Sequence, residues 1–453
     1  MDFPLGFFIA LTLILLFGVE LFLRRREAWA LPMAAVYATV FVWYFVDFLG
    51  YRERYELIPD LFIAHGFWQI AVFLVCFRIL APSISRRMTR GVLEKTAVSP
   101  GALPYEWLLI SALAIWAILF AIGLAMMDWD VGAALFPMDA RAGIKMWERA
   151  TVETGPSGFL IATASYLYLL ACAFFGTLFI LDRRPVPRVI CIGMILLTWP
   201  YFLLGGTRNQ FLAVCMPMVF AYTLFSKHRL FFKAIVLLIC FLTLDSAFRI
   251  VIKYRNVGYQ GWLSDLGEGT VEEAAHGGLN MFEELCFING YCYSGMAPSL
   301  GKNYLANALN FVPRAIWPGK PMVGDEYSKW RGFESKESPA GFSTGISSGV
   351  IGEGILEFGP FLGPVAPAIL MALWTALLTR WWCQRASNLR LILFLVGMGV
   401  TFNLGRNITL LILWPVVFGY LMVRIAEFLS AARIHPGAGL ASARSSQALI
   451  RTS

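Results

Sequence analysis

The sequence has few charged residues and no recognisable metal-binding or nucleotide-binding motif. Only 15% of its 453 residues are charged, whereas soluble chains carry about 25%. No Cys-x-x-Cys pair, and no Walker, G-x-G-x-x-G, G-x-S-x-G or H-E-x-x-H pattern in its required context, is present. Only Cys286 and Cys292 share a polar segment, where they could pair, although a spacing of six does not indicate a disulfide. These absences exclude a soluble globular enzyme, and we expect no metal and no cofactor.

Long apolar runs account for the low proportion of charged residues. Hydrophobic residues make up 58% of the chain, and they gather in runs near the roughly 20 residues that cross a bilayer as a helix. The first run precedes the basic cluster Arg24, Arg25 and Arg26, so we expect it to stay as a span instead of being cleaved as a signal. The sequence predicts an all-α polytopic membrane protein with about eleven transmembrane helices. They lie near residues 3–23, 30–50, 62–80, 105–127, 157–181, 189–204, 211–225, 233–248, 361–379, 391–404 and 408–423.

Lys and Arg are concentrated in alternate connections between these spans. Because cytoplasmic loops carry an excess of Lys and Arg, the pattern predicts an extracytoplasmic N-terminus and a cytoplasmic C-terminus. The net charge of +8 then reflects topology, and we expect no nucleic-acid partner. The basic connections are 24–29, 78–104, 182–188, 227–233, 380–390 and the tail from 424.

The longest polar interruption divides the chain. Residues 1–248 hold the first eight predicted spans, and 249–360 form one large extracytoplasmic loop with short helices and a proline-rich segment. Residues 361–423 hold the last three spans, and 424–453 form a cytoplasmic tail. Ionisable residues inside the spans are few and lie near span ends, whereas an ion-coupled transporter usually keeps charge near the midplane. We therefore expect the chemistry to occur in the large loop.

Two short outer connections each hold one arginine. Arg208 lies in Gly-Gly-Thr-Arg-Asn and Arg406 in Gly-Arg-Asn, so both cations are held at the outer interface. One such arginine could simply be a snorkelling anchor. Two of them beside glycines favour a lipid phosphate or pyrophosphate ligand, because a guanidinium binds phosphate oxygens bidentately. The start of the loop contains Arg249, Lys253 and Arg255. These residues fit two roles equally: positive charges at the interface end of the span, or the rim of a cleft for an anionic substrate.

The large loop contains a stiff, proline-rich segment. Residues 310–321 read Asn-Phe-Val-Pro-Arg-Ala-Ile-Trp-Pro-Gly-Lys-Pro, and three prolines in this stretch forbid a regular helix. Arg314 and Lys320 are therefore presented from a rigid support, which suits a preorganised anion or sugar site. Trp317 lies between them and could stack on a sugar, although a membrane-interface anchor is the commoner role of such a residue.

Carboxylates follow the proline-rich segment. Asp325 comes first, and Glu353 and Glu357 are four residues apart, so we expect the latter two to share a helix face just before the ninth span. A carboxylate near apolar surface can act as a general base on a hydroxyl, and the alternative is a solvated helix end. Upstream, Glu283 and Glu284 are more typical of ordinary charges on an amphipathic helix.

Together these motifs resemble a known family. The motifs look like those of the Wzy-type oligosaccharide repeat-unit polymerases. They are Gly-Thr-Arg on an outer connection, Val-Pro-Arg-Ala-Ile-Trp-Pro-Gly-Lys-Pro in the loop, and Ile-Gly-Glu-Gly before Glu-Phe-Gly-Pro-Phe-Leu-Gly. This family includes O-antigen, enterobacterial common antigen and exopolysaccharide polymerases. The resemblance implies a metal-independent, GT-C-like glycosyltransferase of the bacterial inner membrane. It would move a growing glycan from undecaprenyl pyrophosphate onto the terminal sugar hydroxyl of a single lipid-linked repeat.

The resemblance also implies site residues and partners. Glu353 is the expected base, with Asp325 and Glu357 as substitutes, and nothing in the sequence decides among them. The partners are the undecaprenyl-pyrophosphate-linked donor and acceptor and membrane lipids, with a chain-length-regulating membrane protein as a further candidate. The residues implied in binding pyrophosphate or donor are Arg208, Arg314, Lys320 and, on topology, Arg406.

Two alternative functions stay open. An O-antigen ligase would use the same donor, but the sequence lacks a loop histidine in a recognisable ligase context. A lipid-linked oligosaccharide flippase or polysaccharide exporter would also need cations, but along a cavity through the membrane. The predicted outer arginines lie on one side only, which favours an enzyme at the interface.

Overall fold

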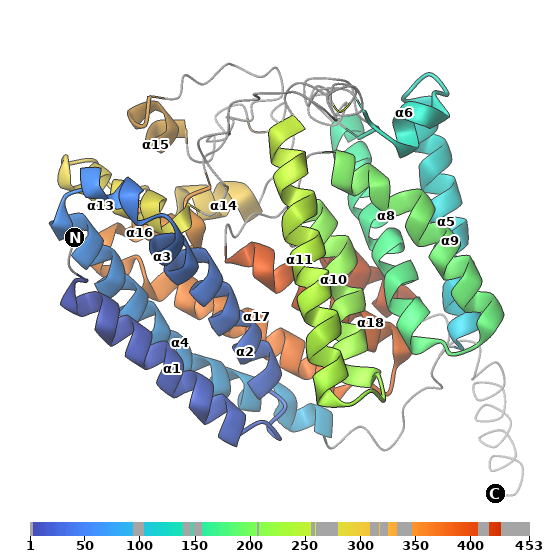
Figure 1. The fold of residues 1–453 in the computed structure, drawn as a ribbon, viewed down its shortest axis with the longest axis horizontal. Coiled ribbons are helices and arrows are strands. Elements are labelled where there is room, and N and C mark those ends of the chain that lie inside the picture. Colours follow the sequence, from blue (N-terminus) through green and yellow to red (C-terminus); the bar gives the residue numbers. More distant parts are fainter. Residues whose placement is uncertain are drawn as a thin grey trace, which may run out of the picture.

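The protein is an all-α bundle. A computed structural model describes residues 3–93, 104–138, 146–147, 156–205, 208–254, 259, 280–308, 317, 325–332, 347–405 and 416–426. These residues contain no β-strand (Figure 1). Eight of the helices are long and apolar enough to cross a membrane. The chain is therefore a polytopic, membrane-embedded protein, as the apolar runs predict.

The eight spanning helices coincide with eight of the predicted runs. Three shorter apolar helices, α10 (Arg208–Phe225), α18 (Asn388–Leu404) and Val416–Ala426, lie at the other three, so the count of eleven stays a prediction. The helix at 60–93 is longer than its apolar run because it continues through Pro82 into a basic stretch. The spanning helices are α1 (Leu5–Leu23), α2 with η1 and α3 (Ala30–Val40, Phe41–Val46, Asp47–Gly50), α4 (Asp60–Leu93), α5 (Tyr105–Ala125), α8 (Pro156–Leu181), α9 (Pro185–Leu204), α11 (Leu230–Tyr254) and α17 (Val365–Cys383).

The two ends of the bundle differ in structure and charge. Short helices gather at one end, which we call the loop end (top of Figure 1). They are η2 (Arg52–Leu57), α6 (Val131–Leu135), α13 (Met281–Tyr293), α14 (Lys302–Ala308) and α15 (Asp325–Trp330). The opposite end, which we call the arginine end, holds the connections that contain Arg24, Arg183, Arg229 and Arg385. Basic connections thus share one end, as predicted, while the orientation of that end toward the cytoplasm stays a prediction.

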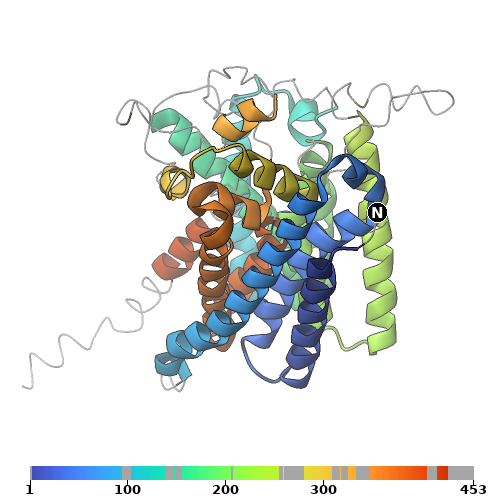
Figure 2. The same ribbon diagram turned by 90° about the vertical axis from the view of Figure 1, so that its left-hand side faces the viewer.

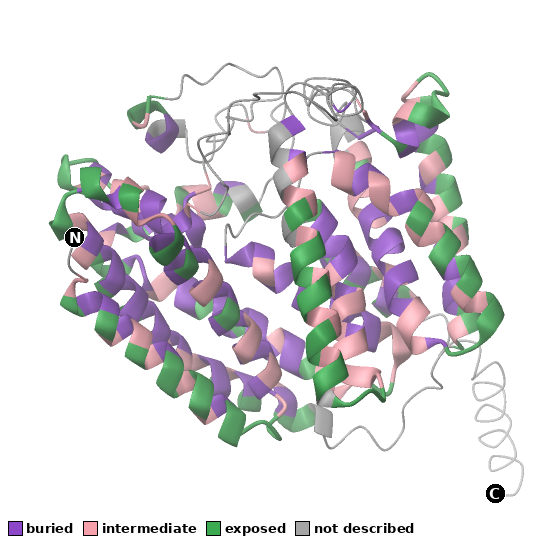
Figure 3. Ribbon diagram, viewed as in Figure 1, coloured by how far each residue is buried: buried purple, intermediate pink, exposed green. Residues whose placement is uncertain are grey.

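Helix α18 joins the two sides of the bundle. α17 lies along α4 on one side, and α10 packs with α8 on the other (Figures 1 and 2). A Cβ on Gly397 would lie 2.5 Å from Leu378 of α17, and one on Gly399 would lie 2.9 Å from Pro217 of α10. Small residues let helices approach closely in a membrane, where packing drives association. α11 instead presents exposed apolar side chains along its outer surface (Figure 3), as a lipid-facing helix does.

Glu20 forms an ion pair near the C-terminal end of α1. Arg24 Nε lies 3.1 Å from Glu20 Oε1, and Arg78 of α4 binds the same carboxylate. The structure also bears on the two cysteines of the polar segment. Cys286 and Cys292 are free thiols on one helix. Six residues of helix rise about 9 Å, which exceeds the roughly 7 Å that a disulfide can bridge between Cα atoms.

The N-terminus of α13 is capped by a carboxylate from another helix. Asp47 is fully buried, and its Oδ2 accepts hydrogen bonds from Phe282 N at 2.9 Å and Glu283 N at 3.3 Å. The Tyr55 hydroxyl donates to the same oxygen at 3.0 Å. First-turn amides have no partner within their own helix, so an external acceptor satisfies them. This cap fixes α13 on the spanning helices at the loop end.

We expect Asp47→Ala to destabilise the protein by about 3 kcal/mol, because it leaves several buried donors without an acceptor. The measurement is thermal loss of monodisperse, detergent-purified protein. Asp130→Ala is the matched control, since Asp130 Oδ1 caps α6 by accepting from Ala133 N at 3.0 Å in an exposed setting. That change should cost about 1 kcal/mol or less. Equal losses of stability in the two variants would contradict the proposed role of the cap.

Candidate functional site

Helix α16 (Gly349–Leu362) carries the predicted carboxylate pair. Glu353 and Glu357 lie one turn apart and are both buried, with 9% and 2% of their surfaces exposed. The shared face is confirmed, and the alternative of a solvated helix end is wrong. A Cβ on Gly352 would lie 2.6 Å from Ile288 of α13, and one on Gly354 would lie 2.1 Å from the Gly363 carbonyl oxygen. The glycines therefore let α16 pack closely against its neighbours.

Tyr44 fixes the first turn of α16. It is fully buried in the π-helical turn η1, and its hydroxyl oxygen accepts a hydrogen bond from Ile351 N at 3.0 Å. Gly349 has φ +73° and lies so close that a Cβ there would be 2.5 Å from the Tyr44 hydroxyl. π-Helical turns are rare and frequently occur at functional sites. The sequence analysis missed Tyr44, whose only signal was a phenol within an apolar run.

Tyr304 of α14 brings a second phenol to the carboxylates. Its hydroxyl is buried and has no hydrogen-bond partner among the described residues. Burial raises the pKa of Tyr304, and the nearby charges of Glu353 and Glu357 raise it further, so the phenol stays protonated. The segment before α14 is tied to α16 because Ser299 N donates to Leu356 O at 3.0 Å and Leu300 N to Glu357 O at 2.7 Å. Glu357 Oε2 is also buried without a partner among the described residues.

The end of α18 contacts the same turn of α16. Val350 N donates to the carbonyl oxygen of Gly405 at 3.0 Å, and Trp43 Nε1 donates to Phe402 O at 2.8 Å. A Cβ on Gly405 would lie 1.9 Å from Thr39, so only glycine fits there. Gly405 directly precedes Arg406, which lies outside the described residues. The residue before Arg406 is therefore hydrogen-bonded to Val350, which lies three residues before Glu353 in the first turn of α16.

The other predicted site residues have the following places. Arg208 is the first residue of α10 and Arg249 lies near the C-terminal end of α11, both toward the loop end; only their backbone is described. Asp325 is the first residue of α15, again with only its backbone described. Trp317 is half-buried. Arg255, Arg314 and Lys320, like Arg406, lie outside the described residues.

The expectation that Glu283 and Glu284 are ordinary charges on an amphipathic helix is wrong, because both are buried. Glu284 is 3% exposed, and it accepts hydrogen bonds from the Tyr327 hydroxyl at 2.5 Å and from Arg331 Nη2 at 3.1 Å. The Arg331 guanidinium also lies 3.7 Å from the Phe287 ring centroid. Burial raises the pKa of Tyr327, and the charge of Glu284 adds to the effect. These contacts anchor α15 on α13.

The sequence contains little that predicts the contact between α15 and α13. Tyr327 and Arg331 are four residues apart and would share one helix face, but their partner Glu284 precedes Tyr327 by 43 residues. Acidic residues in the first turn of a helix are common, because they interact favourably with the helix dipole. The sequence therefore gave no reason to expect Glu284 to be buried.

The site combines two buried carboxylates with two phenol hydroxyls. Such a set can accept a proton from a ligand hydroxyl and can hydrogen-bond to a polyhydroxylated ligand. Within the described ranges, no group of three or more His, Cys, Asp or Glu could hold a metal ion. No protein-family model, curated protein or solved structure matches this chain.

We expect Tyr327→Phe and Tyr304→Phe to differ in their effect on stability. The first removes a buried hydrogen bond to a charged group, which contributes about 1.5–3 kcal/mol, and it should loosen α15. The second removes a hydroxyl that has no partner in the described structure and should leave stability within about 0.5 kcal/mol. Trypsin cleavage at the exposed Lys329 measures the loosening. Cleavage of Tyr327→Phe at the wild-type rate would contradict the anchor.

Proposed function

We propose that this protein is a Wzy-type membrane glycosyltransferase. It polymerises undecaprenyl-pyrophosphate-linked oligosaccharide repeat units into a bacterial surface polysaccharide at the outer face of the inner membrane. One observation carries most of the support: the buried Glu353 and Glu357 lie on a helix whose first turn is hydrogen-bonded to the residue before Arg406. In this proposal Glu353 is the base, and the residue before Arg406, one of the proposed cations, is hydrogen-bonded to the same helix. Of the motifs that resemble the polymerase family, Ile-Gly-Glu-Gly and the start of Glu-Phe-Gly-Pro-Phe-Leu-Gly lie in α16 itself.

The proposed reaction joins two lipid-linked glycans. The terminal sugar hydroxyl of the acceptor attacks the anomeric carbon of the donor glycan, and Glu353 takes the hydroxyl proton as this bond forms. The bond from that carbon to the pyrophosphate oxygen breaks, and undecaprenyl pyrophosphate leaves with the electron pair. Cations stabilise the negative charge of the leaving group. In the proposal those cations are Arg208, Arg314, Lys320 and Arg406.

The tyrosines have supporting roles in this proposal. Tyr44 holds the first turn of α16 through Ile351 N and so orients the carboxylates. The Tyr304 hydroxyl can donate a hydrogen bond to a sugar oxygen, since no described residue accepts from it. Glu357 lies one turn beyond Glu353 and can accept a hydrogen bond from a second sugar hydroxyl.

Glu353→Gln should abolish the polymer ladder, because the amide cannot take the hydroxyl proton. The measurement is polymer length on a gel from cells that lack the gene and are complemented with each variant, at matched membrane abundance. Arg314→Ala should also remove the ladder. Glu56→Gln, at an exposed carboxylate of η2, is the control and should keep it.

The pattern of loss separates the proposed activity from the alternatives. Single repeats attached to their final acceptor indicate a polymerase. Undecaprenyl-linked polymer that never reaches its acceptor indicates a ligase, and single repeats trapped on the cytoplasmic side indicate a flippase. A normal ladder in both Glu353→Gln and Arg314→Ala would overturn the site.

Tyr304→Phe should slow polymerisation about tenfold or more without lowering protein abundance. A lost substrate hydrogen bond of about 1.4 kcal/mol corresponds to a tenfold change, and the deleted hydroxyl has no described partner whose loss would unfold the protein. The measurement is the initial rate of chain extension in membranes. Tyr293→Phe is the control, because Tyr293 is exposed at the loop end. Equal rates in the two variants would remove Tyr304 from the site.

A further inference from the structure

Helix α16 begins beside the interior of a spanning helix. Its Ile351 N donates to the hydroxyl of Tyr44, and the Gly405 carbonyl oxygen that binds the same turn belongs to a glycine packed on Thr39. Tyr44 and Thr39 are part of the span Ala30–Gly50 and precede its loop-end terminus by six and eleven residues. At about 1.5 Å per residue, these separations are roughly 9 and 16 Å along the helix. The first turn of α16 therefore lies at membrane depth.

The other end of α16 is bound to a second spanning helix. Gln69 of α4 and Asn289 of α13 form a two-way amide pair at 2.7 and 3.0 Å, and Gln69 Nε2 also donates to Pro360 O at 3.4 Å. A Cβ on Gly6, in the first turn of α1, would lie 3.1 Å from Phe67 Cβ, two residues before Gln69. The end of α16 thus lies level with the apolar stretches of α1 and α4, not above them.

The break between α16 and α17 has its polar groups paired within the protein. Gly359 has φ +80°, which interrupts the helix, and Gly363 N donates to the Gly359 carbonyl oxygen at 2.8 Å. Pro360 has no N–H, and the carbonyl oxygens of the turn before the break accept from Ser299 N and Leu300 N. Irregular backbone at membrane depth is tolerated only where the protein or a water-filled cavity satisfies it. This break meets that condition.

The exposed surface of this segment is apolar. We call Leu300, Phe361 and Leu362 the apolar face, and they are 73%, 90% and 69% exposed. The only charges of α16 are its two carboxylates, and both are buried. The exposed Lys302 near this face has a stem long enough to place its ammonium among lipid headgroups. α17, which begins at Val365, is itself a span, so the apolar face continues directly into a membrane-spanning helix.

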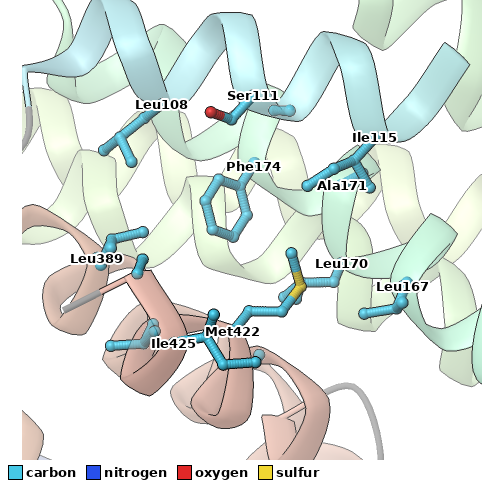
Figure 4. A pocket seen from close by; sticks show the side chains of 14 residues that line it. Leu108, Ser111, Ile115, Leu167, Leu170, Ala171, Phe174, Leu389, Met422 and Ile425 are labelled. Atoms are coloured by element: carbon cyan, nitrogen blue, oxygen red, sulfur yellow. The ribbon is translucent and has the colours of Figure 1, made fainter. Parts of the chain in front are cut away.

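The apolar face is distinct from the apolar cavity of about 400 Å³ shown in Figure 4. That cavity lies between α5, α8, the start of α18 and the helix Val416–Ala426, and none of its lining residues belongs to α13, α14 or α16. The side chains of the apolar face therefore belong to the outer surface of the bundle. At membrane depth, an outer surface without charge is in contact with hydrocarbon.

We propose that α16 is a re-entrant membrane helix whose apolar face contacts the acyl chains of the loop-end leaflet. The last part of the predicted loop 249–360 then returns into the membrane before α17. Glu353 and Glu357 lie below the membrane surface as a result, which favours a membrane-anchored ligand over one that diffuses from water. The inference does not depend on the glycosyltransferase proposal, because it rests on the packing of α16 alone.

Photo-crosslinking tests what covers the apolar face. The full-length protein carries p-benzoyl-L-phenylalanine in place of Phe361, is reconstituted in vesicles of phosphatidylethanolamine and phosphatidylglycerol, and is irradiated. Mass spectrometry then quantifies phospholipid adducts. The same replacement at Trp68, exposed on the spanning part of α4, is the positive control, and that at Glu56, exposed on η2, is the negative control. Adducts at Phe361 should match those at Trp68 and exceed those at Glu56 at least tenfold.

Thiol labelling gives a second measurement with a small side chain. Phe361→Cys and Glu56→Cys are labelled in intact vesicles with a membrane-impermeant maleimide, and the reaction of wild type is subtracted. Both positions precede a helix that runs from the loop end to the arginine end, so the reagent reaches the same fraction of molecules. Phe361→Cys should react at least tenfold more slowly. Equal labelling rates, crosslinked dimers in place of lipid adducts, or adducts no more abundant than at Glu56 would overturn the proposal.

Discussion

Burying a carboxylate in an apolar bundle is costly unless hydrogen bonds or opposite charges compensate, and this protein buries two on one turn of α16. The packing of that helix keeps both carboxylates largely away from solvent. Its first amides are bound by Tyr44 and by the Gly405 carbonyl oxygen, and its glycines allow no gap toward α13 and α17. The rest of the loop end is built around this helix. Binding of a ligand with hydroxyl groups would satisfy the buried oxygen of Glu357 that has no described partner.

Two further buried carboxylates fix the surroundings of α16. Asp47 holds the first turn of α13, and Glu284 near the start of α13 holds α15 through Tyr327 and Arg331. One helix thus connects the spanning bundle to the segment that follows the proline-rich motif. Because both links are buried, loss of either would weaken the attachment of the loop-end helices to the spanning bundle. The positions of the proposed substrate-binding groups on the large loop would then depend on α13.

Much of the fold could be predicted from the sequence, since span position follows from apolar runs and the bilayer permits few alternatives. The shared face of Glu353 and Glu357 could also be predicted, because helical spacing is local. Their burial could not, since it depends on Tyr44, Tyr304 and Gly405, which are distant in the chain. The expectation for Glu284 failed for the same reason. The role of Arg208, Arg314, Lys320 and Arg406 in binding pyrophosphate stays a prediction, because all of these except Arg208 lie outside the described residues.

The most direct measurement is the reaction itself. The purified protein would be reconstituted with a single undecaprenyl-pyrophosphate-linked repeat unit, and both the lipid-linked products and the released undecaprenyl pyrophosphate would be quantified. The account predicts multi-repeat products with one undecaprenyl pyrophosphate released per new linkage, and neither product from Glu353→Gln. Release of undecaprenyl pyrophosphate without chain extension, or full extension by Glu353→Gln, would contradict it.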